Sequence, residues 1–142
     1  MAEFSRDEVY AAWKRRMELQ DSDDWDGFGR TFTEDAVYHE HHYGLFRGRK
    51  AILDWLVPVM EYCKGWTYPV VWVVIDGNRV VHKWMNRLPG KREDGSFFEF
   101  AGMTAMEYAG GGQFSFQEDI YNRVETDKII DEWKAATGGQ YK

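Results

Sequence analysis

The second half of the chain most limits its possible fold, because its residue pattern changes from helical to strand-like at about Tyr68. Runs rich in β-branched and aromatic residues follow one another there, separated by turn signals. We expect strands over residues 68–75, 79–88, 97–108 and 114–124, with turns at 76–78 and 110–112. Four successive strands of this kind predict an antiparallel sheet.

The first half carries helix signals instead. Ser5 and Glu8 match a capping box, and Val9, Trp13 and Met17 follow at helical spacing, which predicts a helix over 6–19. We also expect a short helix that carries Trp25, Phe28 and Phe32, a strand over 36–42, and a helix over 48–63 bent by Pro58.

The order of these segments predicts the fold class. Helices first and strands afterwards indicate a single α+β domain over residues 1–142, with helices packed on one face of a curved antiparallel sheet. A last helical turn is expected around 129–133, followed by a flexible tail over 134–142.

Aromatic residues are abundant, with seven Trp, nine Phe and eight Tyr. They either fill the core and a homodimer face, or line a cavity for a flat apolar ligand. Composition alone leaves both possibilities open. A curved sheet can accommodate both, because its concave face can enclose a cavity while its other face binds a second copy.

Charge and cysteine content exclude several classes of protein. The net charge is −6 and the 18 Lys and Arg residues form no basic run, which argues against nucleic-acid binding. Cys63 is the one cysteine, which excludes an internal disulfide framework and a CxxC metal site. No signal-peptide pattern and no apolar run of ~18 residues is present. We expect a cytoplasmic protein that binds neither membrane nor nucleic acid.

Residues 38–42 (YHEHH) concentrate a carboxylate and three histidines in one predicted strand. Tyr38, Glu40 and His42 would share one face of that strand. If Glu40 faces an apolar cavity, desolvation would raise its pKa toward the range of a general base. The alternatives for Glu40 are an ion pair with Arg47 or Arg49, or exposure to solvent.

His39 and His41 would project from the other face, at a spacing that suits two imidazole ligands of one metal ion. A catalytic zinc site needs a third protein ligand and an orienting carboxylate. His82 could supply the third ligand, but no spacing rule requires it. We therefore expect hydrogen-bonded or solvent-facing histidines, and no metal.

Two later strands carry functional groups at alternate positions. His82, Trp84 and Asn86 would project together and supply a proton carrier, a stacking surface and an amide that polarises a carbonyl. Alternatively, Trp84 belongs to the core and His82 bonds locally. Asp119 and Tyr121 also share a face, where Asp119 could equally form a buried ion pair.

Three segments resemble SnoaL-like members of the NTF2-like superfamily: residues 24–28 (DWDGF), 32–37 (FTEDAV) and 44–52 (GLFRGRKAI). The resemblance extends over roughly residues 9–124. It implies an NTF2-like cone, in which a curved antiparallel sheet wraps around the N-terminal helices. Such a cone would contain an internal apolar pocket. This superfamily includes isomerases, cyclases, dehydratases, epoxide hydrolases and non-catalytic binders, so the resemblance implies the fold more closely than the activity.

The resemblance also implies some residue roles. Ketosteroid isomerases have their general base five residues after the Asp of an Asp-Ala pair, and counting from Asp35 reaches Glu40. Their two oxyanion donors fall at Arg16 and near Thr104, so that oxyanion hole is not reproduced. Epoxide hydrolases and polyketide cyclases place a working aspartate on the last strand, where Asp119 lies.

We predict a homodimeric enzyme that transfers protons, without a cofactor, on an apolar steroid-, terpenoid- or polyketide-like substrate. The reaction would be an isomerisation, a cyclisation, or a hydration or dehydration. Glu40 is the expected base, and His82 and Asp119 are the candidates to return the proton. The expected substrate-binding residues are Tyr38, His42, Trp72, Trp84, Asn86, Phe100, Thr104 and Tyr121. The alternative is a non-catalytic NTF2-like domain that binds an apolar ligand or a protein partner.

Overall fold

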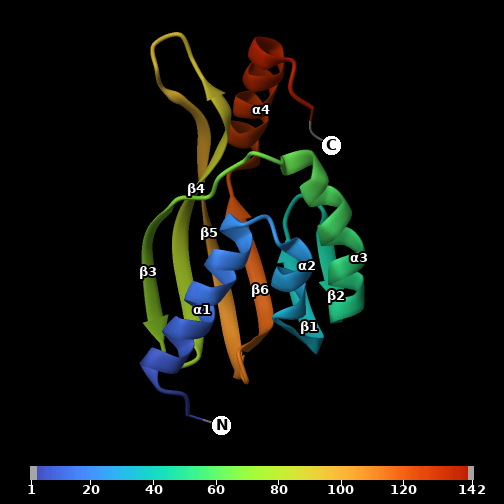
Figure 1. The fold of residues 1–142 in the computed structure, drawn as a ribbon, viewed down its shortest axis with the longest axis vertical. Helices are drawn as coiled ribbons and strands as arrows, with labels where there is room; N and C mark the ends of the chain where they lie inside the picture. The colour runs from blue at the N-terminus through green and yellow to red at the C-terminus, as the bar shows by residue number, and fades with distance from the viewer. Residues whose placement is uncertain (1–2, 141–142) are drawn as a thin grey trace.

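A computed structural model describes residues 3–140. Its elements are, in chain order, α1 (Arg6–Asp21), α2 (Trp25–Arg30), β1 (Phe32–Glu40), β2 (Gly44–Arg47), α3 (Arg49–Met60), the 3₁₀ turn η1 (Glu61–Cys63), β3 (Val70–Asp76), β4 (Arg79–Lys91), β5 (Phe97–Gly110), β6 (Gln113–Tyr121) and α4 (Arg123–Thr137). The α+β class is confirmed. Helices α1, α2 and α3 lie over one face of the sheet, and α4 lies beside the extended ends of β4 and β5 (Figure 1).

The six strands form one curved, unclosed sheet in the order β2-β1-β6-β5-β4-β3. Neighbouring strands are antiparallel except β1 and β6, which run parallel. The sheet is therefore mixed, which corrects the expected antiparallel sheet. Parallel neighbours need a long connection, and here most of the chain lies between the first strand and the last.

Helix α1 begins where the capping box predicts. The Ser5 hydroxyl oxygen accepts a hydrogen bond from the Glu8 backbone N–H at 3.1 Å, which satisfies one of the unpaired amides of the first turn. Strand β1 begins at Phe32, earlier than expected, and its hairpin partner β2 was not predicted. Phe32 is therefore a strand residue and not part of the short helix α2.

Helix α4 is the largest departure from the expected elements. Strand β6 ends at Tyr121 because Asn122 caps the helix, its side-chain oxygen accepting from the Glu125 backbone N–H at 3.2 Å. The helix continues to Thr137, and Gly138 ends it in the left-handed region at φ 71°. Residues 134–137 are therefore helical and not part of a flexible tail. Residues 141–142 of that predicted tail lie outside the described residues.

Two apolar clusters hold the fold together. One lies between α1, α2, α3 and the sheet and includes Val9, Phe28 and Phe114. The other lies against α4 and includes Leu88 and Trp133. Each fully buried side chain of this kind contributes about 1.5–3 kcal/mol to stability. Residues of both clusters line a single pocket, which therefore lies where the clusters meet.

Within residues 3–140, no helix combines the length and the apolar character needed to cross a bilayer.

Candidate active site

Four polar side chains form a row across the inner face of the sheet. The strand pairing places His82 of β4 opposite Thr104 of β5, Thr104 opposite Asp119 of β6, and Asp119 opposite Glu40 of β1. Facing positions on neighbouring strands project their side chains from the same face. All four residues line the pocket, and we call them the polar row.

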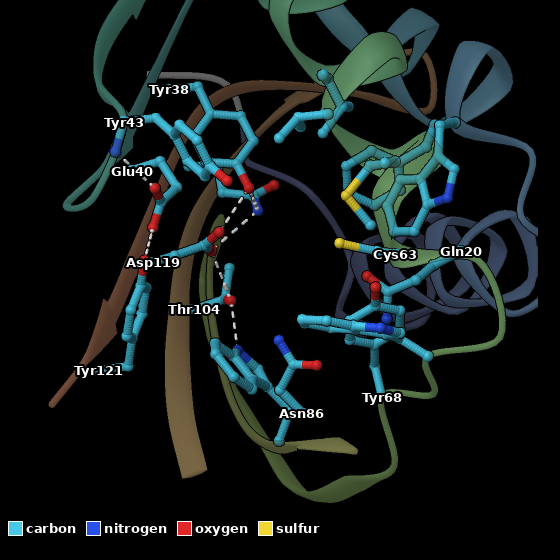
Figure 2. Close-up of a pocket in the computed structure, with 18 of the residues that line it drawn as sticks. Gln20, Tyr38, Glu40, Tyr43, Cys63, Tyr68, Asn86, Thr104, Asp119 and Tyr121 are labelled. Carbon is cyan, nitrogen blue, oxygen red and sulfur yellow. Dashed lines mark hydrogen bonds between the residues drawn. The ribbon is translucent and has the colours of Figure 1, made fainter. Parts of the chain in front are cut away.

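Asp119 accepts hydrogen bonds from three protein groups (Figure 2). The Tyr38 hydroxyl donates to Oδ2 at 2.5 Å, while the Thr104 hydroxyl and the Gln117 amide donate to Oδ1 at 2.8 and 3.0 Å. Burial raises the pKa of Asp119; these three bonds oppose part of the rise, and the charge of Glu40 adds to it. Asp119 therefore takes up a proton at a higher pH than an exposed aspartate.

Glu40 is 5% exposed and lies beside Asp119 in the pocket wall. The Tyr121 hydroxyl donates to its Oε1 at 2.5 Å, and the backbone N–H groups of His42 and Tyr43 donate to its Oε2 at 3.1 and 2.9 Å. The partners of this carboxylate are thus a phenol and two amides, rather than an arginine or solvent. Glu40 also holds the turn between β1 and β2 through the two amide bonds.

His82 is buried, and its ring accepts a hydrogen bond at Nδ1 from the Trp13 indole N–H at 3.3 Å. This bond assigns the imidazole proton to Nε2. Burial, and to a smaller extent the nearby charge of Arg16, lower the pKa of His82 to about 4. The ring is therefore neutral at pH 7, which suits donation of a hydrogen bond better than the predicted return of a proton.

Trp84 orients Thr104, and through it Asp119. The indole N–H of Trp84 donates to the Thr104 hydroxyl oxygen at 2.7 Å, so the Thr104 proton is directed to Asp119. The Trp84 ring lies directly against Gly102, where an added Cβ would lie 2.2 Å from the ring atom Cη2. A side chain at residue 102 would therefore displace Trp84, and only glycine fits.

Most of the predicted site residues meet in this pocket. Besides the polar row, its lining includes Tyr38, Trp84, Asn86, Phe100 and Tyr121. The prediction that alternate residues of β4 and of β6 face the same side of the sheet is therefore confirmed. Whether these residues bind a substrate stays a prediction.

Two predicted substrate-binding residues lie elsewhere. Trp72 is 41% exposed and pairs with Lys83, the neighbour of His82, so it projects from the outer face of the sheet. A register shift between Val70 and Trp72 makes this face impossible to predict from simple alternation. His42 lies beyond the end of β1 in an exposed turn and is not part of the pocket lining.

Several pocket residues were missed by the sequence analysis. Gln117 lies two residues before Asp119 on β6, so alternation alone could have placed it in the site. Trp25, Trp55 and Tyr68 come from the helical half and from the entry to β3, and the sequence gives no signal for their meeting beyond their aromatic character.

The histidines of the outer face pair with a different carboxylate. His39 Nδ1 and His41 Nε2 lie 3.3 and 2.7 Å from Oε2 of Glu118, and one ligand atom from each of the three residues lies within 4.8 Å of the others. His82 projects from the inner face and does not join them. The third potential metal-ligating residue beside His39 and His41 is therefore Glu118 rather than His82, and the three lie on the side of the sheet away from the pocket.

Comparison with known proteins agrees with this architecture. The family model described as the SnoaL-like domain matches residues 9–132. Similar solved structures include an LEH-like epoxide hydrolase from M. tuberculosis, with a TM-score of 0.71 at 16% identity, covering 91% of this chain and 93% of that one. A protein assigned as a SnoaL-like polyketide cyclase from Shewanella putrefaciens CN-32 has a TM-score of 0.73 at 11% identity, covering 87% and 86%.

A third similar structure is TerC, co-crystallised with polyporic acid, with a TM-score of 0.69 at 17% identity, covering 87% of this chain and 98% of that one. Identities this low establish the fold alone. No functionally curated protein matches the chain.

Proposed function

The chain belongs to the SnoaL-like family, and we propose that it is an enzyme that transfers protons on an apolar small molecule without a cofactor. The observation that carries this proposal is the polar row, in which two carboxylates and a neutral imidazole face one apolar pocket in register. Acid–base catalysis typically uses titratable groups that share one pocket but have different pKa values because their surroundings differ.

Asp119 is the proposed proton acceptor. A general base works best with a pKa near the working pH, and burial raises the pKa of Asp119 in that direction. Protein donors occupy three of the roughly four acceptor positions of its carboxylate, which leaves one for a substrate. This choice replaces Glu40 as the leading base, because Glu40 also holds the β1–β2 turn.

In the proposed step, the Asp119 carboxylate takes a proton from a carbon next to a carbonyl group. The electron pair of that C–H bond forms a new C=C bond while the π pair of the carbonyl moves to its oxygen. Where a C=C bond already adjoins that carbon, Asp119 returns the proton to the far end of the existing C=C bond as the carbonyl re-forms. The net change is an isomerisation. Tyr38 keeps its own proton throughout, because burial raises its pKa well above the ordinary value.

His82 is the proposed donor to the developing oxyanion. It lies two strands from Asp119 in the polar row, and its Nε2 carries the proton of a neutral ring. A neutral imidazole can stabilise an oxyanion by a hydrogen bond without giving up its proton. Trp84 and Phe100 supply apolar walls for a flat steroid-, terpenoid- or polyketide-like skeleton.

A binding domain without chemistry is the second candidate. It is favoured by the extensive hydrogen bonding of both carboxylates, since Asp119 and Glu40 each accept three hydrogen bonds from the protein itself. Carboxylates that accept several bonds from the protein also occur in networks that only maintain the shape of a pocket.

Deuterium exchange distinguishes the two candidates. The protein is incubated in D₂O with a panel of steroid ketones, terpenoids and aromatic polyketides, and each compound is examined by mass spectrometry. An enzyme of the proposed kind introduces deuterium next to a carbonyl, even where the reaction has no net product. Saturable binding without deuterium uptake or product would identify a binding domain.

Asp119→Asn tests the role of the base. Turnover or exchange should fall by roughly 10²–10⁴-fold, the usual contribution of one positioned base. Glu118→Gln is the matched control, because Glu118 precedes Asp119 on β6 but projects from the outer face. Full turnover in Asp119→Asn would remove Asp119 from the mechanism.

A further inference from the structure

Within residues 3–140, nearly all of the buried side-chain polar atoms that lack a hydrogen-bond partner belong to residues that line the pocket. Within residues 3–140, these side-chain atoms are Trp25 Nε1, Trp55 Nε1, Tyr68 Oη, Asn86 Oδ1, Gln117 Oε1 and Thr126 Oγ1, together with Arg16 Nη2. All except the arginine belong to residues that line the pocket. Buried polar groups in folded proteins are nearly always hydrogen-bonded, so this concentration in one place indicates groups that serve a ligand.

Three of these residues lie together, away from the carboxylates. Thr67 pairs with Arg87 in an antiparallel bridge, so Tyr68 and Asn86 are the next facing pair toward the pocket. The Trp25 ring meets the Tyr68 ring edge to face, with centroids 5.9 Å apart. Figure 2 shows Tyr68 across the pocket from Glu40, Asp119 and Tyr121.

The chemistry of the three atoms defines what they can bind. Trp25 Nε1 offers a hydrogen, Tyr68 Oη offers a hydrogen, and Asn86 Oδ1 accepts one. A hydroxyl group complements this set, because its oxygen accepts from Tyr68 or Trp25 while its hydrogen donates to Asn86. In this orientation of the Asn86 amide, a ketone oxygen would pair with the donors but leave Asn86 Oδ1 unpaired, and an alkyl group would pair with none of the three atoms.

We propose that Trp25, Tyr68 and Asn86 form a binding subsite for a hydroxyl group at the end of the ligand remote from Asp119. The substrate class is then a rigid apolar skeleton with oxygen at both ends, a reactive carbonyl at the polar row and a hydroxyl at this subsite. This inference rests on the proposed function for the carbonyl end only. The hydroxyl end follows from the unpaired atoms and applies equally to a binding domain.

Two steroid probes test the subsite. Testosterone carries a ring ketone and a distal hydroxyl, and androst-4-en-3-one lacks only the hydroxyl. Their dissociation constants are measured by equilibrium dialysis with mass-spectrometric detection. The wild type should bind testosterone at least about tenfold more tightly, the effect of one well-formed hydrogen bond.

Tyr68→Phe should remove most of that difference. The affinity for testosterone should fall about tenfold, while the affinity for androst-4-en-3-one should stay within about twofold. Tyr10→Phe is the control, because Tyr10 is an exposed tyrosine of α1 outside the pocket lining. The melting temperature of ligand-free Tyr68→Phe should equal or exceed that of the wild type, because no internal hydrogen bond is lost.

The outcomes separate the two proposals. Equal affinity of the wild type for both steroids, failure of both to bind, or equal weakening of both by Tyr68→Phe would overturn the subsite. A lower melting temperature of ligand-free Tyr68→Phe would also overturn it, since the hydroxyl would then be engaged within the protein. Retained discrimination without deuterium exchange would overturn the enzyme proposal and leave the subsite intact.

Discussion

The two faces of the sheet use the same strands, yet place chemically similar residues in opposite surroundings. On β6, Asp119 faces the pocket and accepts three hydrogen bonds, whereas Glu118 faces outward and contacts two half-exposed histidines. On β4, His82 is buried and neutral, whereas its neighbour Lys83 projects from the outer face opposite Trp72. The chemistry of a side chain here depends on which face it occupies.

Gly102→Ala should have the largest effect on the stability of the fold. A methyl group on the inner face would collide with the Trp84 ring, so we expect the free energy of unfolding to fall by about 1–3 kcal/mol. Chemical denaturation measures this change. Ala101→Ser, one position earlier on the exposed side of β5, should change stability by less than about 0.5 kcal/mol. Equal stability of the two variants would show that Trp84 is free to move.

Met103→Glu tests the proposed use of the outer face. Met103, Ile120 and Trp72 are 41%, 52% and 41% exposed. Met103 pairs directly with Ile120, and Lys83 lies between Met103 and Trp72 in the same row of the outer face. We propose that a second copy of the chain covers this face, since burying it would remove apolar area from water. Sedimentation velocity should show a dimer for the wild type and a monomer for Met103→Glu.

The control for that experiment is Lys128→Glu, which changes an exposed residue of helix α4 rather than a strand residue of the outer face, and this variant should remain dimeric. A monomeric wild type would contradict the dimer.

Glu40→Gln should have a smaller effect, visible in the pH profile. Glu40 carries a negative charge beside Asp119 and contributes to the raised pKa of that carboxyl. Removing the charge lowers the pKa of Asp119, so its basic form persists to lower pH. The acidic limb of kcat/KM should therefore move to lower pH. An acidic limb that moves to higher pH would show that Glu40 acts through something other than its charge.

The smallest effect is expected from His39→Gln combined with His41→Gln. Both histidines are half-exposed, and ion pairs in such surroundings contribute little. The free energy of unfolding should change by less than about 1 kcal/mol, and turnover should stay within about twofold of the wild type. A large loss of turnover would show that the outer face communicates with the pocket.

Local sequence patterns predicted many of the elements, because helix caps and strand alternation depend on residues that are close together in the sequence. The capping box placed the start of α1, and alternation placed His82, Trp84 and Asn86 together in the pocket. The start of α4 could also have been found, because Asn122 is a good N-cap and Glu125 follows it at capping-box spacing.

Long-range pairing explains what the sequence could not reveal. Glu40 and Asp119 meet because β1 and β6 pair in parallel, and nothing in either strand specifies that register. Trp72 was placed on the wrong face because β3 is apolar on both sides and contains a register shift. His42 was placed in a strand that ends two residues earlier, where Glu40 binds the turn amides.

The regular spacing of the polar row determines how far apart the catalytic groups of such a site can be placed. Adjacent strands lie about 4.8 Å apart. Moving an acid or a hydrogen-bond donor from one position of the polar row to the facing position on the next strand therefore shifts that group sideways by about 4.8 Å, while it still faces the pocket. A related protein could thus reach reacting atoms farther apart through two point substitutions, with every loop and helix unchanged. The strand spacing of the sheet would then set the distances available between catalytic groups.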